Sequence, residues 1–359
     1  MRVALTHVYG WPEVRRGAER YLHELAGALH SAGHDVRILT TASAPSRGEV
    51  RGVPVHYLRR RHLAPRHLRG QSDEIAFGAA ALRWLAGARI DVWHAMGTAD
   101  AAAAAVLGSV RDIRSVYTDH GFPQRQSRSR RPDRRLHELV VRRVDRYVCV
   151  SQAAAWHLRE GYGREAVVLS GGVDIRRFTP GAQRSALPTL LFASAADEER
   201  KNLPLLLEAV ALLRRRGVPV ELWLAGPGDQ AGAVAAAPSE ARAVTRALGI
   251  VAPDDLASLY GQAWVTVLPA VSEAFGLVLV ESLACGTPVV ALDQGGPREI
   301  VSPGVGALAA PTAEDLARAC EEAIALAREG DIAARCREVA MAWDWSSAIV
   351  PRMEEIYGC

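Results

Sequence analysis

Several features are scarce or missing in this chain of 359 residues, and each absence makes one class of protein or site less expected. No stretch contains eighteen uninterrupted apolar residues, so a membrane-spanning helix is not expected. The apolar run at the start is too short for a signal peptide and is typical of a first strand. Five cysteines stand without metal-ligand spacing, which indicates a cytoplasmic protein. No Asp-x-Asp motif is present, and no metal site is predicted.

Lysine is almost absent, because Lys201 is the only lysine among 43 basic residues. Two explanations of this single lysine stay open. It is there by chance, or position 201 needs a compact, flexible ammonium group that arginine does not imitate. The formal charge of +3 also hides an asymmetry. Residues 1–180 have 29 Arg against 17 acidic residues, or +12, and the remainder has 14 basic against 23 acidic residues, or −9. Because their net charges have opposite signs, the two halves of the chain are predicted to have different functions.

Arginines gather in two stretches of the first half. They are Arg59, Arg60, Arg61, Arg66 and Arg69, and then Arg125, Arg128, Arg130, Arg131, Arg134, Arg135, Arg142, Arg143 and Arg146. Two interpretations stay open: a solvated face, or attraction to an anionic acceptor or to the inner face of an anionic membrane. Nucleic acid is not predicted as a partner, since few aromatic residues are interleaved to stack on bases.

Strand-like runs alternate with helical segments twice along the chain. The expected strands are Val3–Leu5, Val36–Leu39, Val53–Leu58, Val92–His94, Arg114–Thr118, Tyr147–Val150, Val167–Leu169, Leu190–Ala193, Val220–Ala225, Val265–Leu268 and Val289–Leu292. This alternation predicts an α/β protein with parallel sheets that helices cover on both faces. Length favours two domains, which we place at residues 1–180 and 185–344.

The most informative stretch of the chain is Ser-Glu-Ala-Phe-Gly-Leu-Val-Leu-Val-Glu, with Glu273 near its start and Glu281 at its end. Phe275, Gly276 and Leu277 open a helix whose first backbone N–H groups would form an anion site. A nucleotide diphosphate held there would leave its sugar beside Glu273 and its ribose near Glu281. An amphipathic helix behind a strand explains either acid alone equally well, but the whole pattern is more specific.

This stretch resembles the donor-site signature of retaining glycosyltransferases of family four, which have the GT-B architecture. The resemblance implies two Rossmann-like, doubly wound domains that face each other across a cleft, with residues 345–359 crossing back to the first. It also implies that Glu273 contacts the sugar, that Glu281 holds the ribose, and that the backbone from Ala274 to Leu277 lines the diphosphate site.

The strand-to-helix turn that opens the second half carries a further part of the resemblance. The family usually has Gly-Arg there and a lysine some six residues later, and both basic groups bind the diphosphate. Lys201 matches that lysine, although a solvated lysine at a helix start is the alternative. Ser194 and Ala195 replace Gly-Arg, so one expected cation is missing. Arg200 and Arg16 are the candidates to replace it.

Two turns in the first half resemble the family as well. Arg16-Gly17-Ala18-Glu19 resembles a Gly-Gly-Ala-Glu turn, in which Gly17 lets the backbone approach the donor and acceptor. Thr118-Asp119-His120-Gly121 implies that His120 hydrogen-bonds the transferred sugar rather than attacking it. A purely structural histidine is the alternative.

Gly226-Pro-Gly-Asp-Gln-Ala fits the dinucleotide-binding fingerprint, but no acid ends a strand about 20 residues later, as ribose recognition would need. Gly295-Gly296-Pro297-Arg298-Glu299 resembles the family's Gly-Gly-x-x-Glu turn near the donor, although tight-turn glycines alone explain most of it. No nicotinamide or other cofactor is therefore predicted.

The predicted function is that of a retaining glycosyltransferase. It would move a sugar from a nucleotide-diphosphate sugar, with UDP or GDP favoured, to a hydroxyl of a small molecule, a glycan or a lipid-linked glycan. Two alternatives stay open. One is a sugar-nucleotide epimerase or hydrolase on the same fold, and the other is a non-catalytic binding protein.

Overall fold

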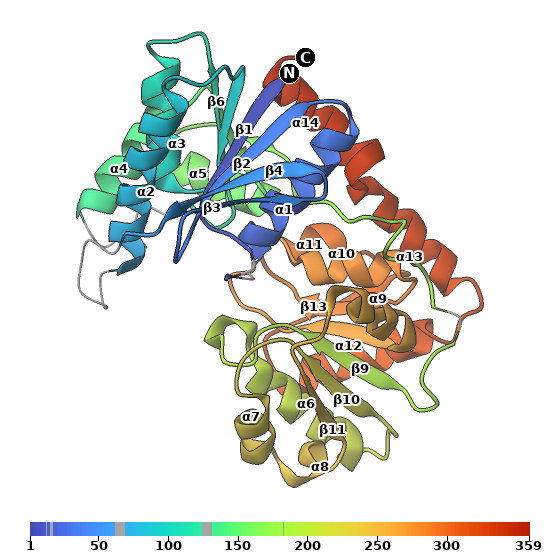
Figure 1. Ribbon diagram of the computed structural model, residues 1–359. Helices are drawn as coiled ribbons and strands as arrows, with labels where there is room; N and C mark the ends of the chain where they lie inside the picture. Colours follow the sequence, from blue (N-terminus) through green and yellow to red (C-terminus); the bar gives the residue numbers. More distant parts are fainter. Residues whose placement is uncertain (12, 15–16, 62–68, 124–130, 182) are drawn as a thin grey trace. The chain divides into compact units, whose positions relative to one another are not determined.

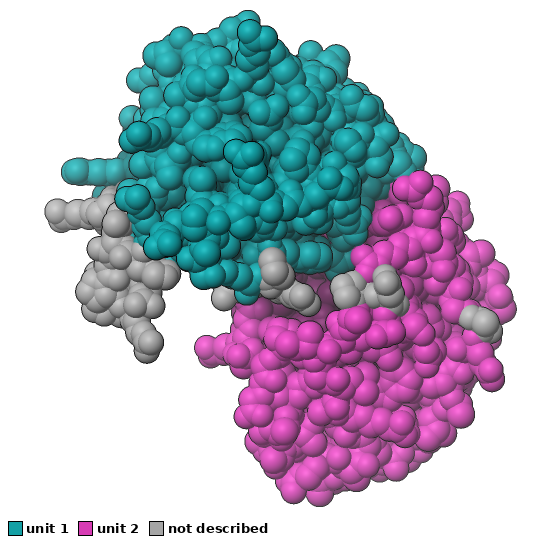
Figure 2. Space-filling model, viewed as in Figure 1, with its two compact units in different colours: residues 1–172, 345–359 teal, residues 173–344 magenta. Residues whose placement is uncertain are grey.

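The computed structural model describes residues 1–359 except 12, 15–16, 62–68, 124–130 and 182. The chain divides into two compact units, residues 1–172 with 345–359 and residues 173–344 (Figure 2). Arg16, Arg66, Arg125, Arg128 and Arg130 of the sequence predictions lie outside the described residues. Within the described part, no helix is both long enough and apolar enough to cross a bilayer.

The chain leaves the first unit after Gly172, earlier than the predicted boundary between residues 180 and 185. The segment that follows is bonded to the second unit. Val173 N–H donates to the carbonyl of Trp343 at 2.8 Å. The Arg337 guanidinium donates to the carbonyls of Ile175 and Phe178 at 2.8 and 3.0 Å. These bonds attach residues 173–178 to the second unit, and a local sequence pattern does not encode them.

The first unit has an eight-stranded sheet in the order β3-β4-β2-β1-β5-β6-β7-β8 (Figure 1). Its strands are β1 (Arg2–Tyr9), β2 (Asp35–Ala42), β3 (Ser46–Val50), β4 (Val53–Arg59), β5 (Val92–Ala95), β6 (Arg114–Asp119), β7 (Arg146–Cys149) and β8 (Val167–Val168). Its helices are α1 (Gly17–Ser31), α2 (Arg69–Leu85), α3 (Thr98–Gly108), α4 (Arg131–Arg143), α5 (Gln152–Tyr162), the short π-helix η4 (Trp345–Ile349) and α14 (Val350–Tyr357).

Helices cover both faces of this sheet. Ala4 and Val8 of β1 pack in a cluster with residues of α2, α3, α4 and α5, whereas Val3 and Leu5 pack with residues of α1 and α14. Successive side chains of a strand point to opposite faces, so a strand buried on both sides is a continuous apolar run. Such runs are why the sequence predicted these strands.

Strand β3 was not predicted, and it makes the first sheet mixed rather than wholly parallel. It pairs antiparallel with β4, while the other pairings of the sheet are parallel. Its sequence is Ser-Arg-Gly-Glu-Val, and most of its residues are exposed. An edge strand of this kind has no apolar pattern to reveal it.

The second unit has a six-stranded, wholly parallel sheet in the order β11-β10-β9-β12-β13-β14. Its strands are β9 (Thr189–Ala193), β10 (Glu221–Ala225), β11 (Thr245–Gly249), β12 (Val265–Leu268), β13 (Val289–Leu292) and β14 (Gly306–Ala309). Its helices are η2 (Glu199–Lys201), α6 (Leu203–Arg215), α7 (Gln230–Ala236), α8 (Ser239–Arg242), α9 (Pro253–Gln262), α10 (Leu277–Ala284), α11 (Pro297–Ile300), α12 (Ala313–Leu326), α13 (Ile332–Ala340) and η3 (Met341–Trp343).

The two outer strands of this sheet, β11 and β14, were also not predicted. Strand β11 is largely exposed, and β14 is the short sequence Gly-Ala-Leu-Ala. The inner strands carry the core, in which Leu190, Phe192 and Leu224 pack with Leu206 and Leu316 of α6 and α12. The sequence therefore predicted the buried centre of each sheet and missed weakly apolar edge strands.

Candidate active site

The strand order of the second unit brings two distant segments of the chain together. Strands β9 and β12 are neighbours, although β10 and β11 lie between them in sequence. The connections from β9 and β12 run to opposite sides at this point, which is the switch point where doubly wound sheets bind ligands at the carboxyl ends of their strands. Arg200 and Lys201 follow β9, and Glu273 follows β12.

Three charged side chains meet at this switch point. Lys201 Nζ lies 2.6 Å from Glu273 Oε2, and Arg200 Nη1 lies 2.8 Å from the same oxygen. The side chains of Lys201 and Glu273 are each 13% exposed, whereas that of Arg200 is 42% exposed. Arg200 also contacts Glu198 Oε1 at 2.8 Å. The structure thus brings together Arg200, Lys201 and Glu273, which the sequence predicted separately.

The charges of this cluster control its protonation. Burial by itself would raise the pKa of Glu273, but the charges and hydrogen bonds of Lys201 and Arg200 outweigh it and lower that pKa. Glu273 is therefore an anion at neutral pH, and it shares one oxygen between two cations. In this cluster of three charged side chains, an incoming anion could compete with the Glu273 carboxylate for both cations.

Backbone hydrogen bonds fix the loop that carries Glu273. Val271 N–H donates to the Arg200 carbonyl at 2.8 Å, and Gly296 N–H donates to the Glu273 carbonyl at 3.0 Å. Ser272 takes up a left-handed conformation with φ of 54°. Three loops, after β9, β12 and β13, are therefore joined at the backbone around the charged cluster.

Helix α10 begins directly after this loop. Gly276 stands at its N-cap with φ of 106°, a conformation that favours glycine. The first turn of a helix leaves backbone N–H groups without an intrahelical acceptor, and it carries partial positive charge. Ala274 and Phe275, the residues just before it, are largely buried. The predicted anion site at Phe275 to Leu277 thus has the expected helix start.

Glu281 lies deeper than the sequence indicated, with only 1% of the residue exposed. Its Oε2 accepts a hydrogen bond from the hydroxyl of Tyr260 in α9 at 2.8 Å. Tyr260 was not singled out in the sequence, and only the folding of α9 against α10 brings it to this carboxylate. A role in ribose binding stays a prediction.

The glycine motif after β10 is accounted for by packing. A Cβ atom at Gly226 would lie 2.5 Å from the carbonyl oxygen of Ser194, and one at Gly228 would lie 2.5 Å from Asp197 Oδ1. Both glycines have positive φ values, 139° and 100°. The turn must therefore be glycine-rich because it rests on the loop after β9.

In the first unit, His120 follows β6 and Gly17 begins α1. The imidazole of His120 packs edge-on against Tyr21 with ring centres 4.7 Å apart. Its Nε2 is buried and has no hydrogen-bond partner among the described residues. Burial and the nearby His7 lower the pKa of His120 to about 4, with Asp119 acting in the opposite direction. A neutral imidazole with an unused nitrogen is suited to a ligand hydroxyl.

Comparison with known proteins agrees with this geometry. Residues 15–177 match the family model "Glycosyltransferase Family 4", and residues 187–325 match "Glycosyl transferases group 1". The chain is 30% identical to a phosphatidyl-myo-inositol mannosyltransferase of Mycobacterium tuberculosis, over 96% of this chain and 94% of that protein. The chain belongs to glycosyltransferase family 4.

A second relative and a solved structure are also similar to this chain, and the structure bears on the fold alone. A D-inositol 3-phosphate glycosyltransferase of Paenarthrobacter aurescens is 31% identical over 80% of this glycosyltransferase and 79% of that protein. The structure of sucrose-phosphate synthase from Thermosynechococcus elongatus superposes with a TM-score of 0.86 at 23% identity, covering 99% and 98% of the two chains. The two α/β units are thus those of the GT-B architecture.

The sequence analysis expected a cation to be missing at Ala195 and named two arginines as possible replacements. In the structure, the neighbouring Ala196 N–H is bonded to the carbonyl of Pro227 at 2.8 Å. Arg200 is placed at the charged cluster, as one of the two predicted replacements. The other, Arg16, lies outside the described residues.

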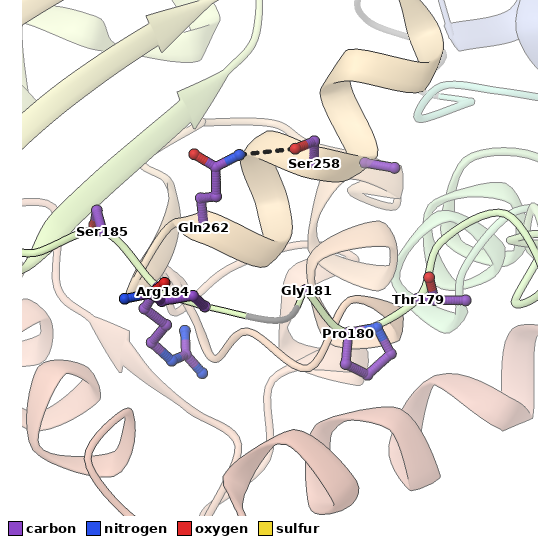
Figure 3. A pocket seen from close by; sticks show the side chains of 9 residues that line it. Thr179, Pro180, Gly181, Arg184, Ser185, Ser258 and Gln262 are labelled. Atoms are coloured by element: carbon purple, nitrogen blue, oxygen red, sulfur yellow. Dashed lines mark hydrogen bonds between the residues drawn. The ribbon is translucent and has the colours of Figure 1, made fainter.

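The second unit also has a cavity of about 540 Å³ (Figure 3). It is lined by Thr179, Pro180, Gly181, Gln183, Arg184, Ser185, Ala257, Ser258 and Gln262. These residues precede β9 and β12, so the cavity is at the amino-terminal edge of the parallel sheet. Its Arg184 guanidinium is bonded to carbonyls of Ala263 and Gly286 at 2.6 and 3.0 Å and is structural. The candidate active site is therefore the switch point, at the carboxyl-terminal edge of the same sheet.

Gly296→Ala should damage the donor loop. The new Cβ would lie 2.2 Å from the Ala274 oxygen and 2.7 Å from Phe275 Cα, and neither backbone atom can move freely. We expect a loss of about 1–3 kcal/mol in the free energy of unfolding, as for overpacking, together with weaker nucleotide binding. Thermal unfolding and nucleotide titration measure the two effects. Gly330→Ala is the control, since nothing lies within 4 Å of its Cβ; equal effects would contradict the contact.

Acid should weaken the first unit through its buried histidines, of which His94 is the test case. Burial raises the pKa of Asp100 in the same unit to about 8, so that carboxyl acts in the opposite direction. Burial lowers the pKa of His94 from 6.5 to about 3, with a smaller effect of His120 in the same direction. Between those values the unfolded state binds a proton that the folded state does not. Stability is therefore fully present above pH 6.5 and is lost as pH falls, by up to about 1.4 kcal/mol per pH unit for each such histidine. Urea unfolding of the native chain and of His94→Gln from pH 7 to about 5 tests this. Asp100 contributes equally to both proteins, so the same slope in the two would contradict the role of His94.

Proposed function

We propose that this glycosyltransferase moves a sugar, with retention of anomeric configuration and without a metal, from a UDP- or GDP-sugar to an acceptor hydroxyl. One observation carries the proposal: Lys201 and Arg200 converge on Glu273 at the switch point, beside the start of α10. Two cations and a helix N-terminus are the groups that a diphosphate requires. No other cofactor is proposed, since the nucleotide sugar is a co-substrate.

We propose that the donor diphosphate draws Lys201 and Arg200 away from Glu273. The negative charge that develops on the departing phosphate would be stabilised by these cations and by the amides at Phe275 to Leu277. A well-placed donor at such a charge contributes roughly 3 kcal/mol to lowering the barrier. Glu273, released from one or both cations, would then accept hydrogen bonds from the sugar.

The bond changes proposed are those of front-face substitution. The bond from the anomeric carbon to the diphosphate oxygen breaks, and the acceptor oxygen forms its new bond on the same face. The proton of the acceptor hydroxyl passes to the departing phosphate oxygen, so no side chain needs to act as a nucleophile. We assign His120 a hydrogen bond to the transferred sugar, which its free Nε2 supports. We propose that Gly17, which has no side chain, lets the protein backbone approach the donor and the acceptor closely.

Glu281 is proposed to hold the ribose hydroxyls. Its carboxylate is buried and has one oxygen bonded to Tyr260, so its direction is set before any ligand arrives. A preorganised acceptor of hydrogen bonds loses little entropy when the ribose binds. Tyr260 would then orient Glu281 without contacting the donor itself.

The acceptor is proposed to be anionic and rich in hydroxyls. The chain's relatives are named as acting on phosphatidyl-myo-inositol and on D-inositol 3-phosphate, both inositol compounds with a phosphate. The first half of this chain carries the basic excess that would attract such an acceptor.

Lys201→Ala should lower kcat about 100-fold, because a hydrogen-bond donor at the charge that develops on the departing phosphate is lost.

Glu281→Ala should chiefly weaken the affinity for the nucleotide, because the proposed ribose contact is lost. Titration with UDP-, GDP- and dTDP-sugars, followed by turnover with inositol phosphates, measures both. Arg318→Ala, an exposed position of α12, is the control. Free sugar or an epimer without acceptor would indicate the hydrolase or epimerase instead, and tight binding without turnover the non-catalytic protein.

We also propose that the first unit works at an anionic membrane surface on the cytoplasmic side. Helix α4 buries His137, Val140 and Val141. It exposes Arg134, Arg135, Arg142 and Arg143, with Leu139 37% exposed among them. Each arginine near such a surface contributes about 1 kcal/mol.

Arg142→Gln with Arg143→Gln should weaken binding to phosphatidylserine vesicles roughly 30-fold at low salt, since two such contributions are lost. Co-sedimentation measures this. The matched control is Arg214→Gln with Arg215→Gln, an exposed pair in the last turn of α6. Equal binding by both pairs, or equal binding of the native chain to neutral vesicles, would rule out this surface.

A further inference from the structure

A chain of buried polar groups lies beneath His120 in the first unit. Asp119, the last residue of β6, has 7% of its surface exposed, and its Oδ2 lies 2.7 Å from the hydroxyl of Tyr147 in β7. The same hydroxyl lies 2.8 Å from Nε2 of His137 in α4, a fully buried side chain. His137 Nε2 is also 3.7 Å from Asp119 Oδ2. Three separate elements therefore meet at one carboxylate.

The hydrogen bonds of this chain have a definite direction. An ionised carboxylate only accepts, so the Tyr147 hydroxyl donates its one proton to Asp119. The tyrosine oxygen can then only accept, and the donor to it is the Nε2–H of His137. The chain runs from His137 through Tyr147 to Asp119, and it sets the tautomer of the histidine.

The second oxygen of Asp119 holds the turn that follows. Gly121 N–H donates to Asp119 Oδ1 at 3.0 Å, a side-chain bond to the backbone two residues on. The residue enclosed by this bond is His120. The carboxylate thus fixes the backbone that aims the His120 imidazole at Tyr21, and it is itself fixed from below by Tyr147.

Burying three polar side chains is costly unless each one is bonded, and apolar residues would fill the same space with less risk. A connected polar network does, however, specify one arrangement. The arrangement specified here is that of the turn at His120, whose Nε2 is buried and without a partner in the described part of the chain.

We propose that Tyr147 and His137 are positioning residues that act through Asp119 to hold His120 in its working orientation. This inference rests on the proposed function for the role of His120 in transfer. The network lies within the first unit, whereas Lys201, Glu273 and Glu281 belong to the second. Its loss should therefore slow transfer and leave nucleotide binding intact.

Tyr147→Phe tests the proposal with two independent readouts. In histidine-labelled protein, with His120→Gln used for assignment, the ring signals of His120 should shift or broaden. kcat should fall by about 10- to 100-fold, as for small misplacements of a reacting group, with nucleotide affinity within about twofold of the native value. Tyr57→Phe, which removes a half-buried hydroxyl from β4 of the same sheet, should change neither.

A second pair of variants covers the case in which Tyr147→Phe does not fold. His137→Gln keeps an N–H donor and should retain most of the rate, whereas His137→Leu should lose as much as Tyr147→Phe. Unchanged His120 signals in Tyr147→Phe, or equal rates in the two His137 variants, would overturn the positioning role. A native chain that binds no nucleotide sugar would instead refute the proposed function, and the His120 signals would still report on the network.

Discussion

The sharing of the Glu273 carboxylate by Lys201 and Arg200 is the interaction around which the second unit's site is organised. A partly buried acid would be unstable without cations, and two adjacent cations would repel each other without an acid. The acid and the two cations therefore stabilise one another in their charged forms. The loops after β9, β12 and β13 are bonded through their backbones at this point, so the charges and the chain path support each other.

This arrangement would also allow the two cations to exchange the Glu273 carboxylate for an anionic ligand. The cluster is neutralised internally by flexible side chains, and Arg200 remains 42% exposed. An anionic ligand at the start of α10 can replace the carboxylate as the partner of the cations without leaving any of them unpaired. The energetic cost of opening the cluster is then largely offset by the contacts that the ligand makes.

The first unit shows the opposite design. Asp119 is held by Tyr147 and Gly121 within a buried network, and His120 presents a nitrogen that the described residues leave unused. Here the polar groups are locked rather than exchangeable. In the proposed function, a donor site that must release a product and a histidine that must keep one orientation toward the sugar place different demands on the same α/β scaffold. His120 and Glu273 both follow the carboxyl ends of parallel strands, β6 and β12, where loops are free to carry function.

The sequence by itself determined the buried strands, the helix that begins after Gly276 and the identity of the charged residues, because periodicity, glycine and local motifs act over a few residues. It did not reveal β3, β11 or β14, whose residues are exposed or weakly apolar. Only the tertiary structure decided that Arg200 joins Lys201 at Glu273, that Tyr260 holds Glu281 and that Tyr147 supports Asp119. Those contacts join residues far apart in the chain, and sheet order and packing, which no local pattern encodes, set their distances.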